Sequence, residues 1–331
     1  IMKKTFKQHT LQGPAQMPDP IIGPGLFLIF LLLTASCQKQ GQETVQKPGP
    51  TISLAEWSLH RNIQQGKIAH LDFPRIAVDS FGLHHIEYVS QFFQDKAQDK
   101  AYLRRMKDSC TKYGVTNLLI MIDGEGNLGN LDPEERQQAV RKHKKWIEEA
   151  QFLNCQAIRV NGNGLGDTAR VKEAVVKSLR TLSQWGKKAG IRILVENHGM
   201  VLPDGTWDPA APSTNGKWLA GVLAAVNNEY CGALPDFGNF HNYDRYQGVK
   251  ELMPYAFGIS AKTYTFGDKG EAVQTDFSRM FKIINPYTLK GAIGAEYEGP
   301  ASNGLTEYQG IRQTVRLIRK YADNTTYSEN K

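Results

Sequence analysis

Short apolar runs alternate with longer amphipathic stretches from residue 51 onward. Eight runs have the length and composition of buried strands: 52–58, 84–90, 117–123, 156–162, 191–197, 231–238, 257–264 and 292–299. The segments between them carry helix signals. One opens with Asp132, Pro133 and two glutamates, and another opens at Asp167, residue types that favour a helix N-terminus. The pattern therefore predicts alternating strands and helices.

This alternation predicts a parallel sheet, because continuous apolar strands joined by helices are buried on both faces. Eight units in roughly 280 residues have the size of a single (β/α)8 TIM barrel, which we expect over residues 51–325. A doubly wound open sheet is the main alternative. It is weakened because no glycine-rich phosphate fingerprint follows the first strand, and GNGLG at 162–166 lacks the Walker lysine and the dinucleotide spacing.

Residues 1–36 have the pattern of a secretory signal peptide. A basic start precedes the apolar run 26–33, which is too short to span a bilayer, and small residues lead to Cys37. This arrangement resembles a bacterial lipobox. Cys37 is then the lipidated first residue of an exported, periplasmic or outer-membrane-anchored lipoprotein, whose only membrane contact is that N-terminal lipid anchor. A plain cleaved signal peptide is the alternative. Residues 37–50 are interpreted as a flexible tether.

Composition excludes some classes of function. The 331 residues carry a net charge of +7, but basic residues alternate with acids in amphipathic stretches such as 140–152. We interpret them as solvated helix faces and expect no nucleic-acid partner. Cys110, Cys155 and Cys231 are odd in number and widely separated, which favours buried free thiols over a zinc site or a disulfide framework.

Polar residues follow several predicted strands, at the end of a barrel where active sites lie. From the first, fourth, fifth, sixth, seventh and eighth strands these are Trp57 and His60; Arg159 and Asn161; Glu196, Asn197 and His198; Asp236, Asn239 and His241; Ser260, Lys262 and Tyr264; Glu296 and Glu298. A single acid at a strand end is often a cap or a surface charge. Several carboxylates aimed at one axis repel one another unless a cation neutralises them. Oxygen-rich ligation favours Mn²⁺, Mg²⁺ or Co²⁺ over Zn²⁺, which an added imidazole would favour.

The stretches LVENHG (194–199), PDFGN (235–239) and GAEYEG (294–299) resemble the sugar phosphate isomerase/epimerase superfamily of xylose isomerase-like TIM barrels. The resemblance covers about residues 51–322. It implies that Glu196, Asp236 and Glu296 hold one divalent metal ion. It also implies that the two glutamates form an acid/base pair on opposite faces of the substrate carbon.

The sequence departs from the family at its strand-seven histidine. Ser260 stands at that position, two residues before Lys262, and Asn239 replaces another histidine frequent in the family. A site of three carboxylates completed by water would follow, or no catalytic metal at all. His198 or His241 could supply an imidazole instead, although a structural or hydrogen-bonding role is favoured for both. Glu298 is expected to form a salt bridge or to contact the metal ligands without binding the metal itself.

The resemblance implies a metal-dependent isomerase or epimerase that acts on a free sugar or keto-sugar through an ene-diolate. Lys262 would stabilise the developing oxyanion or carry a proton. The candidate substrate-binding residues are Trp57, Asn161, His198, Asn239 and Tyr264. Trp207 lies in the long segment 200–218, which is interpreted as a lid. The expected partner is a small carbohydrate, and export favours an unphosphorylated one.

Three alternatives remain. A lyase or dehydratase would use the same proton removal on a keto-sugar or oxidised glycoside and expel a leaving group by β-elimination. A catalytically degenerate, carbohydrate-binding barrel is suggested by Ser260. A nuclease of the endonuclease IV type needs several histidines around three zinc ions, and the chain has only 8 histidines, mostly elsewhere. The sequence leaves the oligomeric state open.

Overall fold

The computed structural model describes residues 51–322. The predicted signal segment 1–36, the tether 37–50 and Cys37 lie outside the described residues, as do residues 323–325 of the predicted barrel. None of the helices in the described part is long and apolar enough to cross a membrane.

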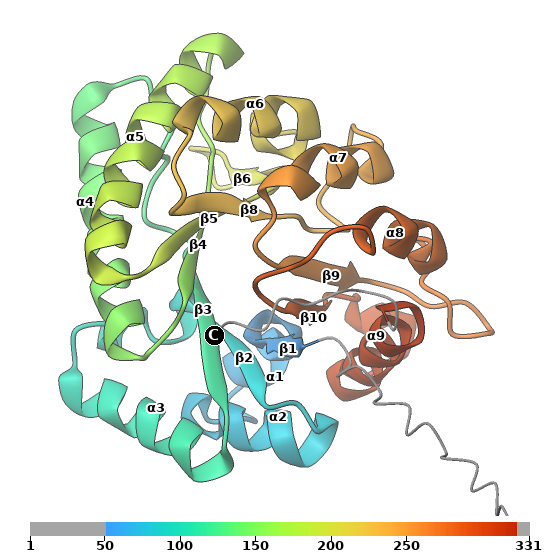
Figure 1. Cartoon of the computed structure of the whole chain (residues 1–331). Helices are drawn as coiled ribbons and strands as arrows, with labels where there is room; N and C mark the ends of the chain where they lie inside the picture. The colour runs from blue at the N-terminus through green and yellow to red at the C-terminus, as the bar shows by residue number, and fades with distance from the viewer. Residues whose placement is uncertain (1–50, 323–331) are drawn as a thin grey trace, which may run out of the picture. The chain divides into compact units, whose positions relative to one another are not determined.

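Eight parallel strands form a ring with helices around its outside (Figure 1). The strands are β1 (Ile52–Ala55), β2 (His85–Val89), β3 (Thr116–Met121), β4 (Ala157–Asn161), β5 (Arg192–Glu196), β8 (Cys231–Leu234), β9 (Ile259–Thr263) and β10 (Ile293–Tyr297). Their order in the sheet is β8-β5-β4-β3-β2-β1-β10-β9. The predicted TIM barrel is confirmed, and each of the eight apolar runs contains one strand.

The ring closes between β8 and β9 through a few bonds rather than a ladder. Isolated parallel bridges join Ala233 to Ala256 and Asp236 to Ser260. The amide of Phe237 donates to the carbonyl of Ser260 at 3.1 Å, and the amide of Ser260 donates to the carbonyl of Pro235 at 2.9 Å. We call this contact the seam. It fixes the backbone on both sides of Asp236 against β9.

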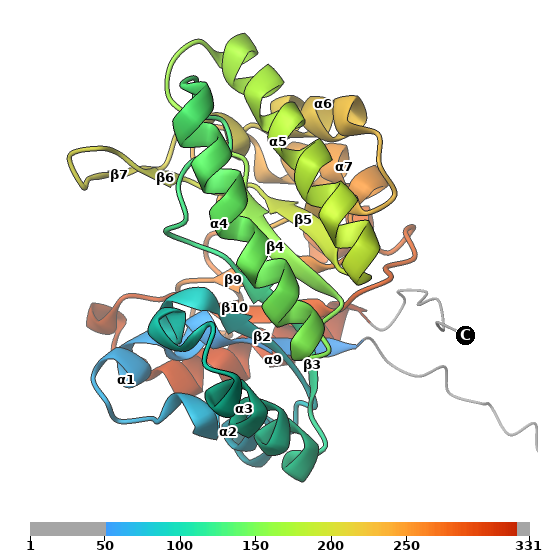
Figure 2. The ribbon, with the colours of Figure 1, turned by 90° about the vertical axis from the view of Figure 1, so that its left-hand side faces the viewer.

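Helices pack against the outer face of the strands (Figures 1 and 2). They are α1 (His60–Gln64), α2 (Phe73–Phe81), α3 (Lys100–Tyr113), α4 (Pro133–Phe152), α5 (Thr168–Ala189), α6 (Gly216–Val226), α7 (Arg245–Leu252), α8 (Phe277–Ile284) and α9 (Glu307–Ala322). The side chain of Asp132 accepts hydrogen bonds from the first-turn amides of α4, and Asp167 caps α5 in the same way. Both predicted helix starts are confirmed.

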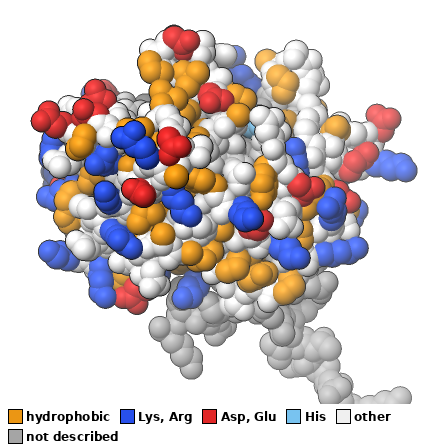
Figure 3. Space-filling view, turned by 90° about the horizontal axis from the view of Figure 1, so that it is seen from above, with side chains coloured by type: hydrophobic (Ala, Val, Ile, Leu, Met, Phe, Trp, Pro, Cys, Tyr) orange, Lys and Arg blue, Asp and Glu red, His pale blue; other side chains and the backbone are white. Residues whose placement is uncertain are grey.

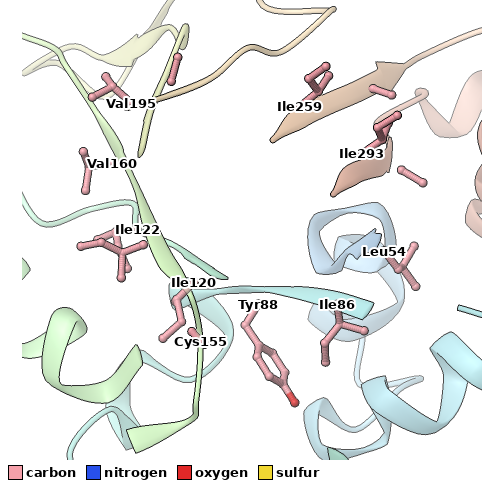
Figure 4. Packing of buried hydrophobic residues seen from close by; sticks show 14 of the residues in the cluster. Leu54, Ile86, Tyr88, Ile120, Ile122, Cys155, Val160, Val195, Ile259 and Ile293 are labelled. Carbon is pink, nitrogen blue, oxygen red and sulfur yellow. The ribbon is translucent and has the colours of Figure 1, made fainter. Parts of the chain in front are cut away.

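Alternate strand residues face opposite sides of the sheet, which produces two hydrophobic cores. The outward-facing side chains, such as Ile86, Tyr88 and Val160, pack between strands and helices (Figure 4). A smaller inward-facing cluster fills the barrel and includes Ala55, Val89, Leu119, Met121, Ala157, Leu194 and Leu234. The inward cluster supports the polar residues at the carboxyl ends of the strands.

The first predicted strand, 52–58, is too long. Strand β1 ends at Ala55, and residues Glu56–Leu59 form a 3-10 helix. The cause lies in side-chain hydrogen bonds: Glu56 accepts from the amide of Val89 at 2.9 Å, and the hydroxyl of Ser58 accepts from the amide of Tyr297. These contacts turn the chain across the end of the barrel instead of extending it.

The segment 200–218, interpreted as a lid, contains a small antiparallel hairpin that the sequence did not predict. Its strands are β6 (Met200–Val201) and β7 (Trp207–Asp208). Asp204 accepts hydrogen bonds from the amide and hydroxyl of Thr206, which forms the turn. The hairpin projects away from the barrel (Figure 2).

The prediction of buried free thiols is confirmed for two of the three cysteines. Cys110, Cys155 and Cys231 are all free thiols, and the first two are buried, whereas Cys231 is partly exposed. On the face seen in Figure 3, basic and acidic side chains are interspersed rather than gathered by sign.

Candidate active site

Three buried carboxylates meet at the carboxyl ends of the strands. Glu196 ends β5, Asp236 lies two residues beyond β8, and Glu296 belongs to β10. Ligand oxygens of the three lie within 4.8 Å of one another, and each residue is at most 4% exposed. Within residues 51–322 this is the group of side chains with metal-ligand spacing. The structure thus brings together the three residues predicted as metal ligands.

Asp236 is held by the backbone around it. Its Oδ1 accepts from the amides of Gly238 at 2.6 Å and Asn239 at 2.9 Å. The side chain of Asn197 bonds the amide and the carbonyl of Asp236 at 2.8 and 3.0 Å. The second carboxylate oxygen of Asp236, Oδ2, is buried and has no hydrogen-bond partner among the described residues. A carboxylate oxygen fixed in this way is available to a cation.

Lys262 in β9 lies among three carboxylate oxygens. Its Nζ is 3.5 Å from Asp236 Oδ2, 3.3 Å from Glu296 Oε1 and 3.2 Å from Glu298 Oε2. Burial alone would lower the pKa of Lys262, but these carboxylates hold it well above its ordinary value. Lys262 is therefore an ammonium ion. Glu298 makes the salt bridge that the sequence predicts.

Arg159 links Glu196 to a further acid. Its Nε lies 2.8 Å from Glu196 Oε2, and its Nη1 and Nη2 lie 2.7 and 3.2 Å from the two oxygens of Asp123. Asn161 also donates to Asp123, at 2.8 Å. Burial opposes ionisation of Asp123, but Arg159 holds its pKa below the ordinary value. Both oxygens of Glu196 are engaged, since Asn239 donates to Oε1 at 3.0 Å.

The cluster is short of positive charge in the absence of a metal ion. Burial raises the pKa of Glu196 to about 7, although Arg159 opposes the shift. Burial likewise raises the pKa of Asp236 to about 6 and raises that of Glu296, with Lys262 opposing in both. Five carboxylates contact the two cations Lys262 and Arg159, and the three with metal-ligand spacing match the donor set of a hard divalent cation. The residues present fit such an ion.

The family's strand-seven histidine has no substitute in the cluster. Ser260 donates its hydroxyl hydrogen bond to Glu296 Oε2 at 2.7 Å. Neither His198 nor His241 belongs to the group with metal-ligand spacing. His198 instead places Nδ1 2.9 Å from the carbonyl of Gly199 and meets the Trp207 ring edge-on. An all-oxygen site follows.

A cavity of about 780 Å³ opens beside the carboxylates. Glu196, Glu296 and Lys262 line it, and so do the five residues predicted to bind substrate: Trp57, Asn161, His198, Asn239 and Tyr264. The Trp57 ring stacks on His60 with ring centroids 4.7 Å apart and donates to Glu298 Oε1 at 2.8 Å. Its orientation is therefore fixed, and it presents an aromatic wall.

Sequence reasoning missed several residues of this site. Asp123 follows β3 as Glu196 ends β5, so its position at a strand exit was the available signal. Glu87 has inward-facing parity in β2, where its Oε1 accepts from Ser53. Glu125 and His143 line the cavity from the segment after β3 and from α4. Glu125 and His143 do not belong to the pattern of polar residues at strand ends, so that pattern could not reveal them.

The structure is an α/β barrel with a candidate acidic metal site at the carboxyl ends of its strands. The sequence profile of the xylose isomerase-like TIM barrel family matches residues 76–321, and the chain belongs to that family. No curated protein sequence matches the chain significantly.

Solved structures share the fold at low identity. An IOLI protein with a bound zinc atom superposes with a TM-score of 0.64 at 15% identity, covering 82% of this chain and 99% of the other. A sugar phosphate isomerase/epimerase from Parabacteroides distasonis gives 0.63 at 14% identity, covering 85% and 98%. The 3-keto-D-glucoside 4-epimerase YcjR from E. coli gives 0.58 at 13% identity, covering 82% and 99%.

Proposed function

We propose that this chain is a divalent-metal-dependent isomerase or epimerase of an uncharged sugar or keto-sugar. The cluster of Glu196, Asp236 and Glu296 carries this proposal, because the three have metal-ligand spacing and lie beside the cavity. Solved structures that share its fold include an IOLI protein with a bound zinc atom and a 3-keto-D-glucoside 4-epimerase, which supports the proposal. An intact cluster also argues against a catalytically degenerate barrel.

The three carboxylates would hold the ion. Their oxygen donors favour Mn²⁺, Mg²⁺ or Co²⁺ over Zn²⁺. When bound, the ion supplies electrostatic polarisation of the carbonyl and hydroxyl oxygens of the sugar.

Glu196 and Glu296 would move the proton. One removes the proton from the carbon next to the carbonyl. The other delivers a proton to the opposite face, which is epimerisation, or to the neighbouring carbon, which is isomerisation. Both side chains line the cavity, which puts them within reach of a bound sugar.

Other residues would bind and polarise the sugar. The Lys262 ammonium faces the cavity and would stabilise negative charge that develops on the ene-diolate oxygen. Trp57 offers a ring face for the apolar side of a sugar, and Asn161 and Tyr264 offer polar groups. Export of the chain stays a prediction that favours unphosphorylated substrates.

Elimination is the second candidate reaction. The cavity of about 780 Å³ lies in the upper part of the range for drug-sized ligands, so a group attached to the reacting sugar has room. If that group stands β to the abstracted proton, the same step expels it. The product mixture separates the two reactions, since elimination leaves an unsaturated ketone and a free leaving group.

The experiment is a panel of sugars and keto-sugars incubated with the purified chain and Mn²⁺ in deuterated water, followed by NMR. We expect deuterium at the carbon next to the carbonyl of at least one compound. Glu196→Gln and Glu296→Gln should each reduce incorporation by at least about 100-fold, the usual range for a lost acid or base.

The matched control is Glu149→Gln. Glu149 is also a buried glutamate, but it pairs with Lys100 at 2.9 Å on the outside of the barrel. Incorporation by this variant should equal that of the native chain. No incorporation across the panel with any divalent ion, or full incorporation by both cluster variants, would contradict the proposal.

A further inference from the structure

The cavity extends beyond the carboxylates on the side of β3. There it is lined by the segment Ile122–Asn127 and by His143 of α4, which we call the acceptor arm. None of these residues touches the proton-transfer pair, except that Asp123 is linked to Glu196 through Arg159. The proposed reaction at the cluster does not use the acceptor arm.

His143 lines the arm and offers it an acceptor. The residue is 3% exposed, and its Nδ1 lies 2.8 Å from the carbonyl oxygen of Ala139, which can only accept. Nδ1 therefore carries the proton, and Nε2 presents a lone pair. Burial lowers the pKa of His143, so the ring is neutral. Nε2 has no hydrogen-bond partner within residues 51–322.

The acids of the arm are already paired with cations. Glu125 Oε1 lies 2.6 Å from Lys145 Nζ and accepts from the indole of Trp146 at 2.7 Å. Asp123 is paired with Arg159 in the same manner. The arm thus presents carboxylate and imidazole acceptors, and its cations are engaged. A phosphate would meet like charge there, whereas a hydroxyl group would donate to these acceptors.

The arm is a built part of the fold. The carbonyl of Leu128 accepts from the hydroxyl of Ser178 at 2.7 Å, and the amide of Gly129 donates to the carbonyl of Asn163 at 2.7 Å. Gly126 has φ +87°, and a Cβ there would lie 3.1 Å from that of Ala139. Its contact with α4 needs a glycine. Such a wall is formed before a ligand arrives.

We propose that the acceptor arm is a second subsite, which binds the hydroxyl groups of an uncharged ring joined to the reacting sugar. The inference rests on the proposed function of the carboxylate cluster. It makes the substrate class a neutral glycoside of two rings instead of a single sugar or a sugar phosphate. His143 is then a residue that determines specificity.

Equilibrium binding tests the subsite independently of turnover. The probes are D-glucose, glucose 6-phosphate, cellobiose, maltose and gentiobiose, titrated into the full chain by calorimetry. At least one disaccharide should bind 10-fold or more tightly than glucose and glucose 6-phosphate. His143→Phe, which keeps an aromatic ring and removes the acceptor, should cut that disaccharide affinity at least 10-fold and leave glucose affinity unchanged.

Two further variants make the result decisive. Asn127→Ala shortens another lining side chain at a partly exposed position and should weaken the same disaccharide alone. His84→Phe changes an exposed histidine outside the cavity and should have no effect. Unchanged disaccharide binding in both arm variants would overturn the subsite, as would binding of glucose or glucose 6-phosphate as tight as any disaccharide, or no sugar binding at all. Selective disaccharide binding without deuterium incorporation would overturn the proposed function and leave the subsite standing.

Discussion

Arg159 orients Glu196 before any substrate binds. Its guanidinium bridges Glu196 and Asp123, and the bidentate contact with Asp123 prevents rotation of the Arg159 side chain. Lysine cannot make both contacts, because it carries a point charge on a flexible stem. Arg159→Lys should therefore lower kcat by about 10- to 100-fold, the range found for residues that orient a reacting group. KM should change little.

Deuterium incorporation at saturating sugar measures this effect. Asp123→Asn is the companion variant: it keeps the hydrogen-bonding shape but weakens the hold on Arg159, so its loss should be smaller and in the same direction. A change confined to KM in either variant would show that Arg159 binds substrate instead of orienting Glu196.

Glu87 is a buried acid whose carboxyl group is only partly satisfied by hydrogen bonds. Its Oε1 accepts from Ser53, while Oε2 has no hydrogen-bond partner among the described residues. Burial raises its pKa from 4.5 to about 7. A carboxyl whose pKa is raised on folding stabilises the fold fully below its unfolded pKa, and that contribution is lost as pH rises through the folded pKa.

Glu87→Gln should consequently gain stability over the native chain as pH rises. The relative gain between pH 4 and pH 9 is on the order of 3 kcal/mol in the free energy of unfolding, from the size of the pKa shift. Urea unfolding in EDTA at the two pH values measures it. The control Glu149→Gln breaks a pair with Lys100 and should show no such gain. A constant difference across pH would contradict the assignment.

We expect Ser260 to set the metal preference of the proposed site. It stands where the resemblance places a histidine, and its hydroxyl only supports Glu296. Ser260→His should add a nitrogen ligand and raise Zn²⁺ affinity relative to Mn²⁺ by about 10-fold or more, because imidazole favours zinc. Competition with a zinc indicator measures this. Ser260→Ala, which removes the hydroxyl and adds no ligand, should not raise it.

At the scale of elements, the sequence predicts the eight strands well, because each is a continuous apolar run. The family resemblance implies that Glu196, Asp236 and Glu296 are metal ligands, and the structure brings these residues together because strand ends of a parallel barrel meet on one face. Prediction from the sequence fails where side chains from distant elements decide the local structure. Residues Glu56–Leu59 turn because of partners on β2 and β10, and His143 reaches the cavity from a helix whose polar pattern reads as solvated.

The β6–β7 hairpin is an element of four paired residues, too short for any apolar pattern to reveal. Its Trp207 is 48% exposed, lines the cavity and packs on Gly199, where a Cβ would lie 2.4 Å from the indole. Because 48% of its surface stays exposed in the fold, Trp207→Ala should cost less stability than the loss of a fully buried aromatic side chain. It should raise KM by about 3- to 10-fold through lost stacking on the sugar, with kcat unchanged.

Steady-state kinetics and a melting curve check this expectation. Thr206→Ala removes an exposed side chain that shapes the turn of the same hairpin without lining the cavity, and it is the matched control. If both variants raise KM equally, the hairpin acts through its overall conformation and not through the Trp207 ring.

At the scale of the whole barrel, the three carboxylates of the cluster lie on both sides of the seam between β8 and β9. Glu196 and Asp236 lie on the side of β5 and β8, whereas Glu296 lies in β10, beside β9. The seam between β8 and β9 has isolated bridges instead of a ladder. A cation bound to all three would therefore tie the two sides of the seam together. Ligand binding to the folded state also suppresses opening by mass action.

Hydrogen exchange across the seam tests this coupling. The amides of Phe237 and Ser260, which form the seam bonds, should exchange more slowly when Mn²⁺ is added. The reduction should reach about 100-fold at 100 times the dissociation constant wherever local opening releases the ion. Amides of β2 and β3, joined by a ladder of five residue pairs, should change less, since their opening does not break the cluster. Asp236→Asn should abolish the protection by weakening the ion's hold. Equal slowing over the whole barrel would show that exchange occurs by global unfolding, and no slowing at the seam would show that the ion does not join β8 to β10.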